Sequence, residues 1–291
     1  MQSLQKPRWI KTRLPGEGMY AEVRRVLRRH RLHTVCEEAL CPNIGECWGG
    51  GTATIMILGD ICTRGCRFCA VKSGNPMGLL DRSEPENVAA AVNELNLNYV
   101  VLTSVCRDDL PDGGASIYAD TVRAIKHLNK DLLVEVLIPD FNGRTEDIKK
   151  VVDSHPDVIA HNVETIRRLT PSVRDRRASY DQSLKVLRTV KHLDKTIFTK
   201  SSIMVGLGET CQEVLDTMRD LRAADVDFIT VGQYLRPTPS HLPVAEYVPP
   251  TVFDFYRQEA LKLGFKYAAC GPLVRSSYRA GEFYIKAVLG R

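Results

Sequence analysis

A chain of 291 residues with 44% hydrophobic and 26% charged side chains can bury a sizeable core, and its length fits one large α/β barrel or two smaller domains. It has no apolar run approaching the roughly 18 residues of a transmembrane helix, and its basic N-terminus lacks the apolar stretch of a secretory signal. The net charge of +5 is mild and does not call for nucleic acid. We therefore expect a cytoplasmic protein with neither a membrane nor a nucleic-acid partner.

Strand-like and helix-like segments alternate along most of the chain. Short apolar runs rich in β-formers predict strands at 52–58, 98–104, 132–138, 157–162, 196–205, 227–231 and 265–269. Helical patterns lie before and between them, at 19–31, 86–95, 115–129, 145–152, 181–192, 209–223 and 250–263. Ser83 and Glu86 have the spacing of a capping box, and Gly264 is expected to end the last helix.

Six consecutive βα units imply a parallel sheet with right-handed crossovers. Such a sheet can be doubly wound or can curl into a partial barrel, and the alternation alone favours neither. In both folds the active-site groups belong in the loops that follow the carboxyl ends of the strands.

Nine cysteines are many for such a chain, and six of them fall between positions 36 and 69. Disulfide frameworks are expected in small secreted domains, so this clustered set indicates metal binding or catalysis. The other three, Cys106, Cys211 and Cys270, are isolated and are expected to be small core residues.

One cysteine motif follows the predicted strand 52–58 and contains Cys62, Cys66 and Cys69 with the spacing Cys-x3-Cys-x2-Cys. Thiolates this close together can hold three corners of an iron–sulfur cubane and leave one iron open for chemistry. A zinc site with a distant fourth ligand is the alternative, although zinc sites usually come as paired short spacings. The motif, including the aromatic Phe68, is similar to that of the radical S-adenosylmethionine superfamily.

The resemblance to that superfamily implies an α/β fold, a partial (β/α)6 TIM-type barrel with N- and C-terminal accessory segments. It implies that the open iron binds the amino and carboxylate groups of S-adenosyl-L-methionine, whose cleavage releases a 5′-deoxyadenosyl radical. It also places contacts to the methionyl amino group at the end of strand 98–104, where Thr103 and Ser104 are the candidates.

Three further polar residues are candidate contacts to S-adenosyl-L-methionine. Asn162 and Glu164 follow strand 157–162, where a carboxylate could hydrogen-bond a ribose hydroxyl or the methionyl amine. Arg177 could bind the methionyl carboxylate with two parallel hydrogen bonds. A surface ion-pair network is the alternative interpretation of these charges.

A second cysteine motif lies upstream, with Cys36, Cys41 and Cys47 spaced as Cys-x4-Cys-x5-Cys. Three more thiolates within twelve residues indicate a second cluster, and again the fourth ligand is missing locally. Pro42 and Gly45 predict loop geometry for this segment.

The second motif, its flanking Cys-Pro-Asn and Gly-Glu-Cys-Trp, and the C-terminal run Arg275-Ser276-Ser277-Tyr278 resemble the lipoyl synthase family. The resemblance implies two [4Fe-4S] clusters, with Ser277 as an oxygen ligand of the auxiliary cluster. A capped turn is the alternative for the serine pair taken alone. A serinate is a harder ligand than a thiolate and is easier to lose, which suits a cluster that is consumed.

For function, the resemblance implies radical insertion of two sulfur atoms at C6 and C8 of a protein-bound octanoyl chain, with the auxiliary cluster as the sulfur source. The implied partners are octanoylated lipoyl carrier domains, of 2-oxoacid dehydrogenase E2 or the glycine cleavage H protein, and a low-potential electron donor such as ferredoxin or flavodoxin. A monomer is expected. The alternatives are another radical sulfur-inserting or methylthio-transferring enzyme, an electron-transfer iron–sulfur protein and a zinc-stabilised binding module.

The expected organisation has three parts. Residues 1–50 form an N-terminal extension with the auxiliary cluster motif, 51–270 the partial barrel, and 271–291 a C-terminal segment with the Arg-Ser-Ser-Tyr motif. The helix 19–31 in the extension is rich in arginine. It is either a solvated face or a docking surface for an acidic carrier domain.

Overall fold

The computed structural model describes residues 5–11, 18–49 and 54–277. Within them, eight strands form one sheet and follow one another across it in chain order. Strand β1 (His33–Thr34) pairs antiparallel with β2, and all later neighbours pair in parallel. The parallel strands are β2 (Thr54–Ile57), β3 (Tyr99–Ser104), β4 (Leu133–Leu137), β5 (Val158–Ala160), β6 (Phe198–Val205), β7 (Phe228–Gln233) and β8 (Tyr267–Gly271).

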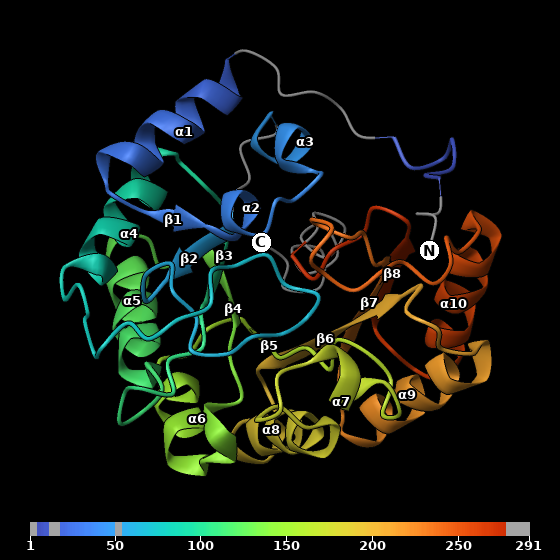
Figure 1. The fold of residues 1–291 in the computed structure, drawn as a ribbon. Coiled ribbons are helices and arrows are strands. Elements are labelled where there is room, and N and C mark those ends of the chain that lie inside the picture. The colour runs from blue at the N-terminus through green and yellow to red at the C-terminus, as the bar shows by residue number, and fades with distance from the viewer. Residues whose placement is uncertain (1–4, 12–17, 50–53, 278–291) are drawn as a thin grey trace.

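Strands β1 and β8 are the two edges of this sheet, which curls but stays open between them in the described part of the chain (Figure 1). A doubly wound sheet reverses its strand order at a switch point, and this sheet does not. The partial barrel expected from the resemblance is therefore confirmed.

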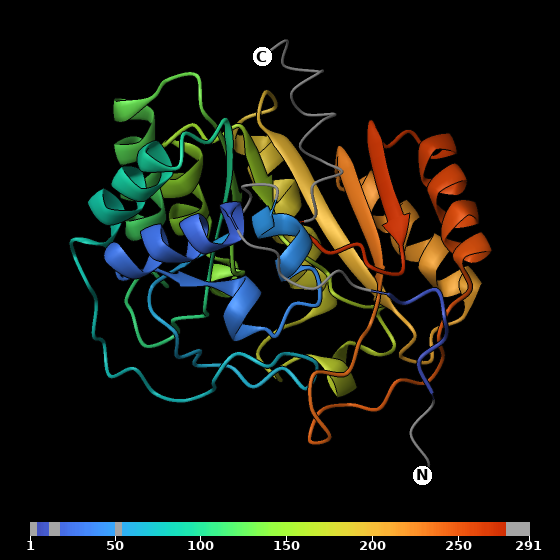
Figure 2. The ribbon, with the colours of Figure 1, turned by 90° about the horizontal axis from the view of Figure 1, so that it is seen from above.

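The longer helices surround the sheet on its outer side (Figures 1 and 2). Among the described helices, none combines the length and the apolarity that a membrane crossing requires. The helices are α1 (Met19–Arg29), α2 (Val35–Glu38), α3 (Ile44–Gly49), α4 (Glu84–Glu94), α5 (Ala115–Leu128), α6 (Thr145–Val152), α7 (Thr170–Val173), α8 (Tyr180–Leu193), α9 (Cys211–Ala223), α10 (Pro250–Lys262) and the 3-10 helix η1 (Phe141–Gly143).

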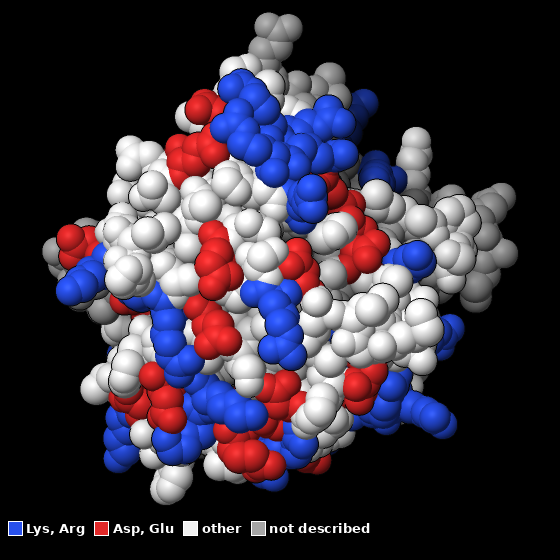
Figure 3. All heavy atoms as spheres, turned by 90° about the vertical axis from the view of Figure 1, so that its left-hand side faces the viewer, with Lys and Arg blue, Asp and Glu red and all other residues white. Residues whose placement is uncertain are grey.

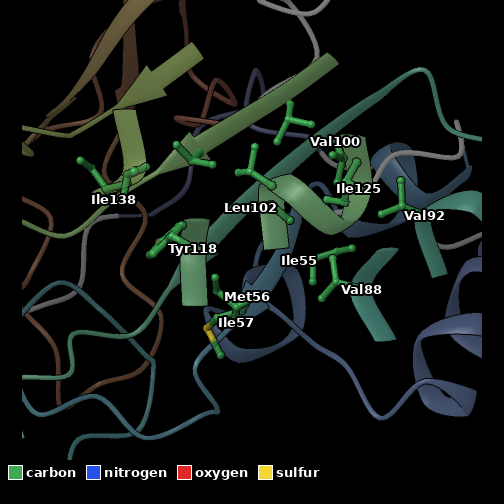
Figure 4. Close-up of a cluster of buried hydrophobic side chains, with 14 of the residues drawn as sticks. Ile55, Met56, Ile57, Val88, Val92, Val100, Leu102, Tyr118, Ile125 and Ile138 are labelled. Atoms are coloured by element: carbon green, nitrogen blue, oxygen red, sulfur yellow. The ribbon is translucent and has the colours of Figure 1, made fainter. Parts of the chain in front are cut away.

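The largest core cluster lies between the first parallel strands and the helices α4 and α5 (Figure 4). Ile55 of β2, Leu102 of β3, Val88 of α4 and Ile125 of α5 are almost completely buried in it. Trp48 of α3 belongs to the same cluster. The N-terminal segment therefore shares the core of the barrel, and removal of its apolar side chains would expose the first strands.

Helix caps differ from the prediction at two places. Ser83 precedes α4 with helical backbone angles and without a capping bond from its side chain, so the predicted capping box is wrong. Its hydroxyl instead donates to Asp81 Oδ1 at 2.6 Å, and its N–H donates to the same oxygen, in a turn that competes with the cap. A capping box does form at α9, between Thr210 and Glu213.

The predicted loop geometry between the upstream cysteines is also wrong, because α2 and α3 occupy most of that segment. The Thr34 side chain accepts the N–H of Glu37 at 3.2 Å and so starts α2. Gly45 lies inside α3, and only the short turn around Pro42 is irregular. The preceding helix α1 ends at Arg29, two residues before the predicted end, where the chain turns toward β1.

Candidate active site

The loop that follows β2, residues 59–74, carries the Cys-x3-Cys-x2-Cys motif, and we call it the cysteine loop. It lies at the carboxyl ends of the parallel strands (Figure 2). The N–H of Cys62 donates to Lys72 O at 2.8 Å and closes the loop on itself. The N–H of Thr63 donates to Cys106 O at 2.9 Å, which fixes the loop to the chain just after β3.

Backbone N–H groups surround the sulfur atoms of the cysteine loop. Cys62 Sγ accepts the N–H of Cys106 at 3.3 Å, and Cys66 Sγ accepts the N–H of Asp175 at 3.3 Å. The Cys106 thiol also hydrogen-bonds to Cys62 and lowers the pKa of Cys62 to about 6. Hydrogen bonds to cysteine sulfurs are one of the means by which proteins set the reduction potential of iron–sulfur clusters.

Arg64, between the first two cysteines of the loop, is only 5% exposed and ties the loop to two strand ends. Its guanidinium donates to Asp108 at 2.8 and 2.9 Å and to Asp140 at 2.7 and 2.8 Å. Burial alone would raise the pKa of Asp140, but the hydrogen bonds and charge of Arg64 hold it at about 2. The loop is thus held from beneath by a buried ion-pair network.

The upstream cysteine motif lies against the C-terminal segment 272–277. Cys36 is in α2, Cys41 in the turn and Cys47 in α3. Asn43 Nδ2 donates to Leu273 O at 2.6 Å and joins two segments that are far apart in the sequence. This contact holds the beginning of the Arg-Ser-Ser run beside the upstream cysteines.

Gly232 of β7 permits the close approach of the C-terminal segment. A Cβ atom at this position would lie 2.1 Å from the carbonyl oxygen of Val274, a backbone atom with little freedom to move. We expect Gly232→Ala to destabilise the protein by roughly 1–3 kcal/mol, the usual cost of overpacking, and to speed proteolysis of segment 272–277. Thermal unfolding and limited proteolysis measure both effects.

The matched control for that substitution is Gly49→Ala. A Cβ at Gly49 meets no described atom within 4 Å, and the residue ends helix α3. Alanine should therefore be neutral or slightly stabilising there. Equal melting temperatures for the two variants would contradict the role assigned to Gly232.

Both cysteine motifs open onto one cavity of about 470 Å³. The predicted cluster ligands all line it: Cys36, Cys41, Cys47, Cys62, Cys66, Cys69 and Ser277. Tyr278, the last residue of the predicted C-terminal motif, lies outside the described residues. The structure therefore brings the predicted ligands to one place, and their roles as ligands stay predictions.

The chemistry of this donor set fits iron–sulfur clusters. Burial raises the pKa of Cys36 to about 11 and that of Cys69 to about 12, so these thiols need a cation beside them to ionise. In the described part of the chain, no three His, Cys, Asp or Glu side chains are spaced to hold a single metal ion. Each thiolate of a cubane binds a different iron, so a triad need not converge on one point.

Four of the predicted contacts to S-adenosyl-L-methionine, together with Phe68, line the cavity. The Thr103 hydroxyl donates to Leu137 O at 3.3 Å and the Ser104 hydroxyl to Val105 O at 2.8 Å. Both hydroxyl oxygens keep lone pairs that can accept hydrogen bonds from a cationic amine. This end of β3 therefore suits an ammonium group.

The other two of these four predicted contacts, Asn162 and Glu164, lie where β5 ends. Asn162 Nδ2 donates to Glu164 Oε1 at 3.0 Å, whereas the buried Asn162 Oδ1 has no hydrogen-bond partner among the described residues. Burial raises the pKa of Glu164, and its φ of 65° is unusual for a residue with a side chain. An unpaired buried acceptor beside a carboxyl that is carried on a strained backbone fits a ligand that brings its own donors.

Arg177, the fifth predicted contact, does not line the cavity. It donates to Asp175 and to Thr63 O, and its side chain is 40% exposed. Arg174, three residues earlier, does line the cavity; it is buried and donates to Ser183 Oγ at 2.9 Å. The sequence prediction missed Arg174. A signal was present, because Thr-Pro marks the start of the short helix α7, and Arg174 follows its last residue, where the chain turns into the site.

Comparisons with known proteins agree with this architecture. A family model for the radical S-adenosylmethionine superfamily matches residues 56–221, and one for the N-terminal domain of lipoyl synthase of that superfamily matches residues 1–41. A lipoyl synthase from Thermus thermophilus is 58% identical over 282 residues, 97% of this chain and 87% of the relative. One from Deinococcus radiodurans is 57% identical over 277 residues, 95% and 84% of the two chains.

Solved structures share the fold at much lower identity. The structure of HydG, the FeFe-hydrogenase maturase from Carboxydothermus hydrogenoformans, superposes with a TM-score of 0.55 at 13% identity. The match covers 93% of this chain and 70% of that one.

An open parallel barrel, with a three-cysteine loop after its first parallel strand and a cavity at the strand ends, defines a radical S-adenosylmethionine enzyme. Such enzymes use S-adenosyl-L-methionine and iron–sulfur clusters. The extent and identity of the matches decide among them: the chain belongs to the lipoyl synthase family.

Proposed function

We propose that this chain makes the lipoyl group by inserting two sulfur atoms at C6 and C8 of an octanoyl chain attached to a carrier-protein lysine. The observation that supports this most is that both cysteine triads and Ser277 line one cavity. A radical source and a sulfur source would then reach the same substrate carbon. Another radical sulfur-inserting or methylthio-transferring enzyme is the alternative, and the C-terminal serine beside the upstream cysteines argues against it.

In this proposal Cys62, Cys66 and Cys69 hold the cluster that supplies, with S-adenosyl-L-methionine, the 5′-deoxyadenosyl radical. Such a radical is needed because an unactivated methylene has no acidic proton for side-chain acids and bases to remove. Asn162 and Glu164 hold the ribose or the amine of the cofactor by hydrogen bonds.

On the other side of the cavity, Cys36, Cys41 and Cys47 hold the auxiliary cluster, and Ser277 completes its ligands. The apolar side chains Val35, Leu137 and Ile138 also line the cavity. They would receive the acyl chain and keep water away, so that the carbon radical meets a sulfide before it is quenched.

The direct test is anaerobic incubation of the reconstituted protein with dithionite, S-adenosyl-L-methionine and an octanoylated lipoyl-domain peptide. We expect 5′-deoxyadenosine to form and the peptide to gain two sulfur atoms, both followed by mass spectrometry. Absence of both products from protein with its full iron content would overturn the proposal. The cytoplasmic location and the monomeric state stay predictions.

For the partner, we propose that helix α1 docks an octanoylated carrier domain, of 2-oxoacid dehydrogenase E2 or of the glycine cleavage H protein. Basic side chains gather at the height of α1 on the face that Figure 3 shows. Arg29 pairs with Glu94, but Arg24 and Arg25 are exposed and have no carboxylate within ion-pair distance among the described residues. The helix is close to the auxiliary site, because the ring of its Tyr20 packs against that of Trp48 in α3, with the ring centroids 5.0 Å apart.

We expect Arg24→Glu with Arg25→Glu to weaken binding of an octanoylated lipoyl domain about tenfold at low ionic strength, since acidic partners are then repelled. The difference should shrink as salt screens the charges. Isothermal titration calorimetry measures both. The control is Lys130→Glu with Lys195→Glu, an equal charge change on exposed residues before β4 and β6, at the opposite end of the barrel. An unchanged Kd at low salt would refute the α1 surface.

A further inference from the structure

The proposed function needs a one-electron donor, and the inference that follows rests on it. The cysteine loop turns one side to the cavity and the other to solvent. Arg64, Cys66 and Phe68 line the cavity. Gly65 and Arg67, which alternate with them along the chain, do not line it and are exposed. The loop therefore lies between the cavity and solvent at this place.

We use the name loop rim for the exposed outer residues of this region: Gly65, Arg67, Lys72 and Arg176. Hydrogen bonds hold the segments that carry them together. The N–H of Arg67 donates to Val173 O at 2.9 Å. The N–H of Gly65 donates to Asp175 Oδ2 at 2.8 Å, which brings the segment before Arg176 against the loop. Lys72 is joined to the start of the loop by the bond that closes it.

The loop rim is cationic. Arg67, Lys72 and Arg176 have no carboxylate within ion-pair distance among the residues that the structure describes. The carboxylates bonded to this side of the loop, Asp108 and Asp175, already pair with other arginines. The rim thus presents positive charge that is not neutralised locally, and a complementary partner is acidic.

We propose that the loop rim docks a small acidic electron-carrier protein. A carrier domain must send its acyl arm into the cavity, and the rim residues do not line that cavity. An electron needs closeness rather than access, and Gly65 and Arg67 of the rim are the chain neighbours of Cys66. The donor loses one electron and the cluster held by the loop gains it; no atom is transferred and no bond to the rim forms.

The test is binding and oxidation of reduced flavodoxin, chosen as an acidic one-electron donor. We expect Arg67→Glu with Lys72→Glu to raise the Kd for flavodoxin about tenfold at low ionic strength and to slow flavodoxin oxidation similarly. The Kd is measured with oxidised flavodoxin and the cluster-loaded enzyme, so it does not depend on turnover. With dithionite, which needs no docking surface, the formation of 5′-deoxyadenosine should not change in Arg176→Glu, a variant of the one rim residue outside the cysteine loop.

The control is again Lys130→Glu with Lys195→Glu, which changes the net charge equally at the far end of the strands. An unchanged Kd in the rim variant overturns the proposal, and so does weaker binding of the octanoylated carrier in place of flavodoxin. If the rim variant does not take up iron, Arg176→Glu carries the test with the same expected direction. A failure of dithionite-driven turnover in the unmodified protein would instead refute the proposed function.

Discussion

Replacing Cys41 with alanine should abolish sulfur insertion but leave the reductive cleavage of S-adenosyl-L-methionine, whereas Cys69→Ala should abolish both. Cys41 belongs to the triad beside Ser277, and Cys69 belongs to the cysteine loop. Each variant should lose one of two clusters, so the iron content should fall by about half in both. Mass spectrometry of the peptide and chromatography of 5′-deoxyadenosine separate the two activities.

A cysteine outside both motifs provides the control. Cys211 is exposed at the start of α9, and Cys211→Ala should keep the iron content and both activities. The separation of roles fails if Cys41→Ala also loses 5′-deoxyadenosine formation while it retains half of the iron. It fails equally if Cys69→Ala still inserts sulfur.

The candidate site was readable from the sequence where its chemistry is local. The six cysteines lie in two short motifs, and spacing alone indicated two clusters. Their neighbours also follow local rules: an apolar run predicts the strand that ends before Cys62, and the helix Thr145–Val152 has the bounds that periodicity predicts.

Contacts between distant segments were not readable in this way. The bond from Asn43 to Leu273 O joins positions whose neighbourhood only the folded barrel sets. The choice between Arg174 and Arg177 depends on where helix α7 ends. Because it ends at Val173, Arg174 lines the cavity and Arg177 does not. Caps fail for a related reason: Asp81 captures the Ser83 hydroxyl, and the spacing of a capping box does not reveal the competitor.

The alternation of elements also could not settle whether the sheet curls into a partial barrel. The same βα alternation builds a doubly wound sheet when the strand order reverses. Here every strand pairs with its successor in the chain, from β1 to β8. The resemblance in the cysteine loop, rather than periodicity, pointed to the barrel.

Arg64→Leu should cost the fold roughly 3–5 kcal/mol, since it removes one partner of a buried ion pair and leaves Asp140, 1% exposed, without its cation. The pKa of Asp140, held at about 2, lies below its ordinary value near 3.8, so this carboxylate stabilises the fold above pH 4. That contribution should disappear as the pH falls toward 2. Urea unfolding of the two proteins at pH 7 measures the loss.

The control is Arg177→Leu, which removes an arginine that shares Asp108 but has an exposed side chain. Exposed pairs contribute little, so this variant should lose less than about 1 kcal/mol. Asp140→Asn should make Arg64→Leu much less costly, because the leucine then leaves no buried charge behind. Additive losses in the double variant, or equal losses at the two arginines, would mean that the loop is held by its backbone contacts and not by this network.

If the network does hold the loop, Arg64→Lys should restore only part of the stability that Arg64→Leu loses, because an ammonium cannot bind both carboxylates as the guanidinium fork does.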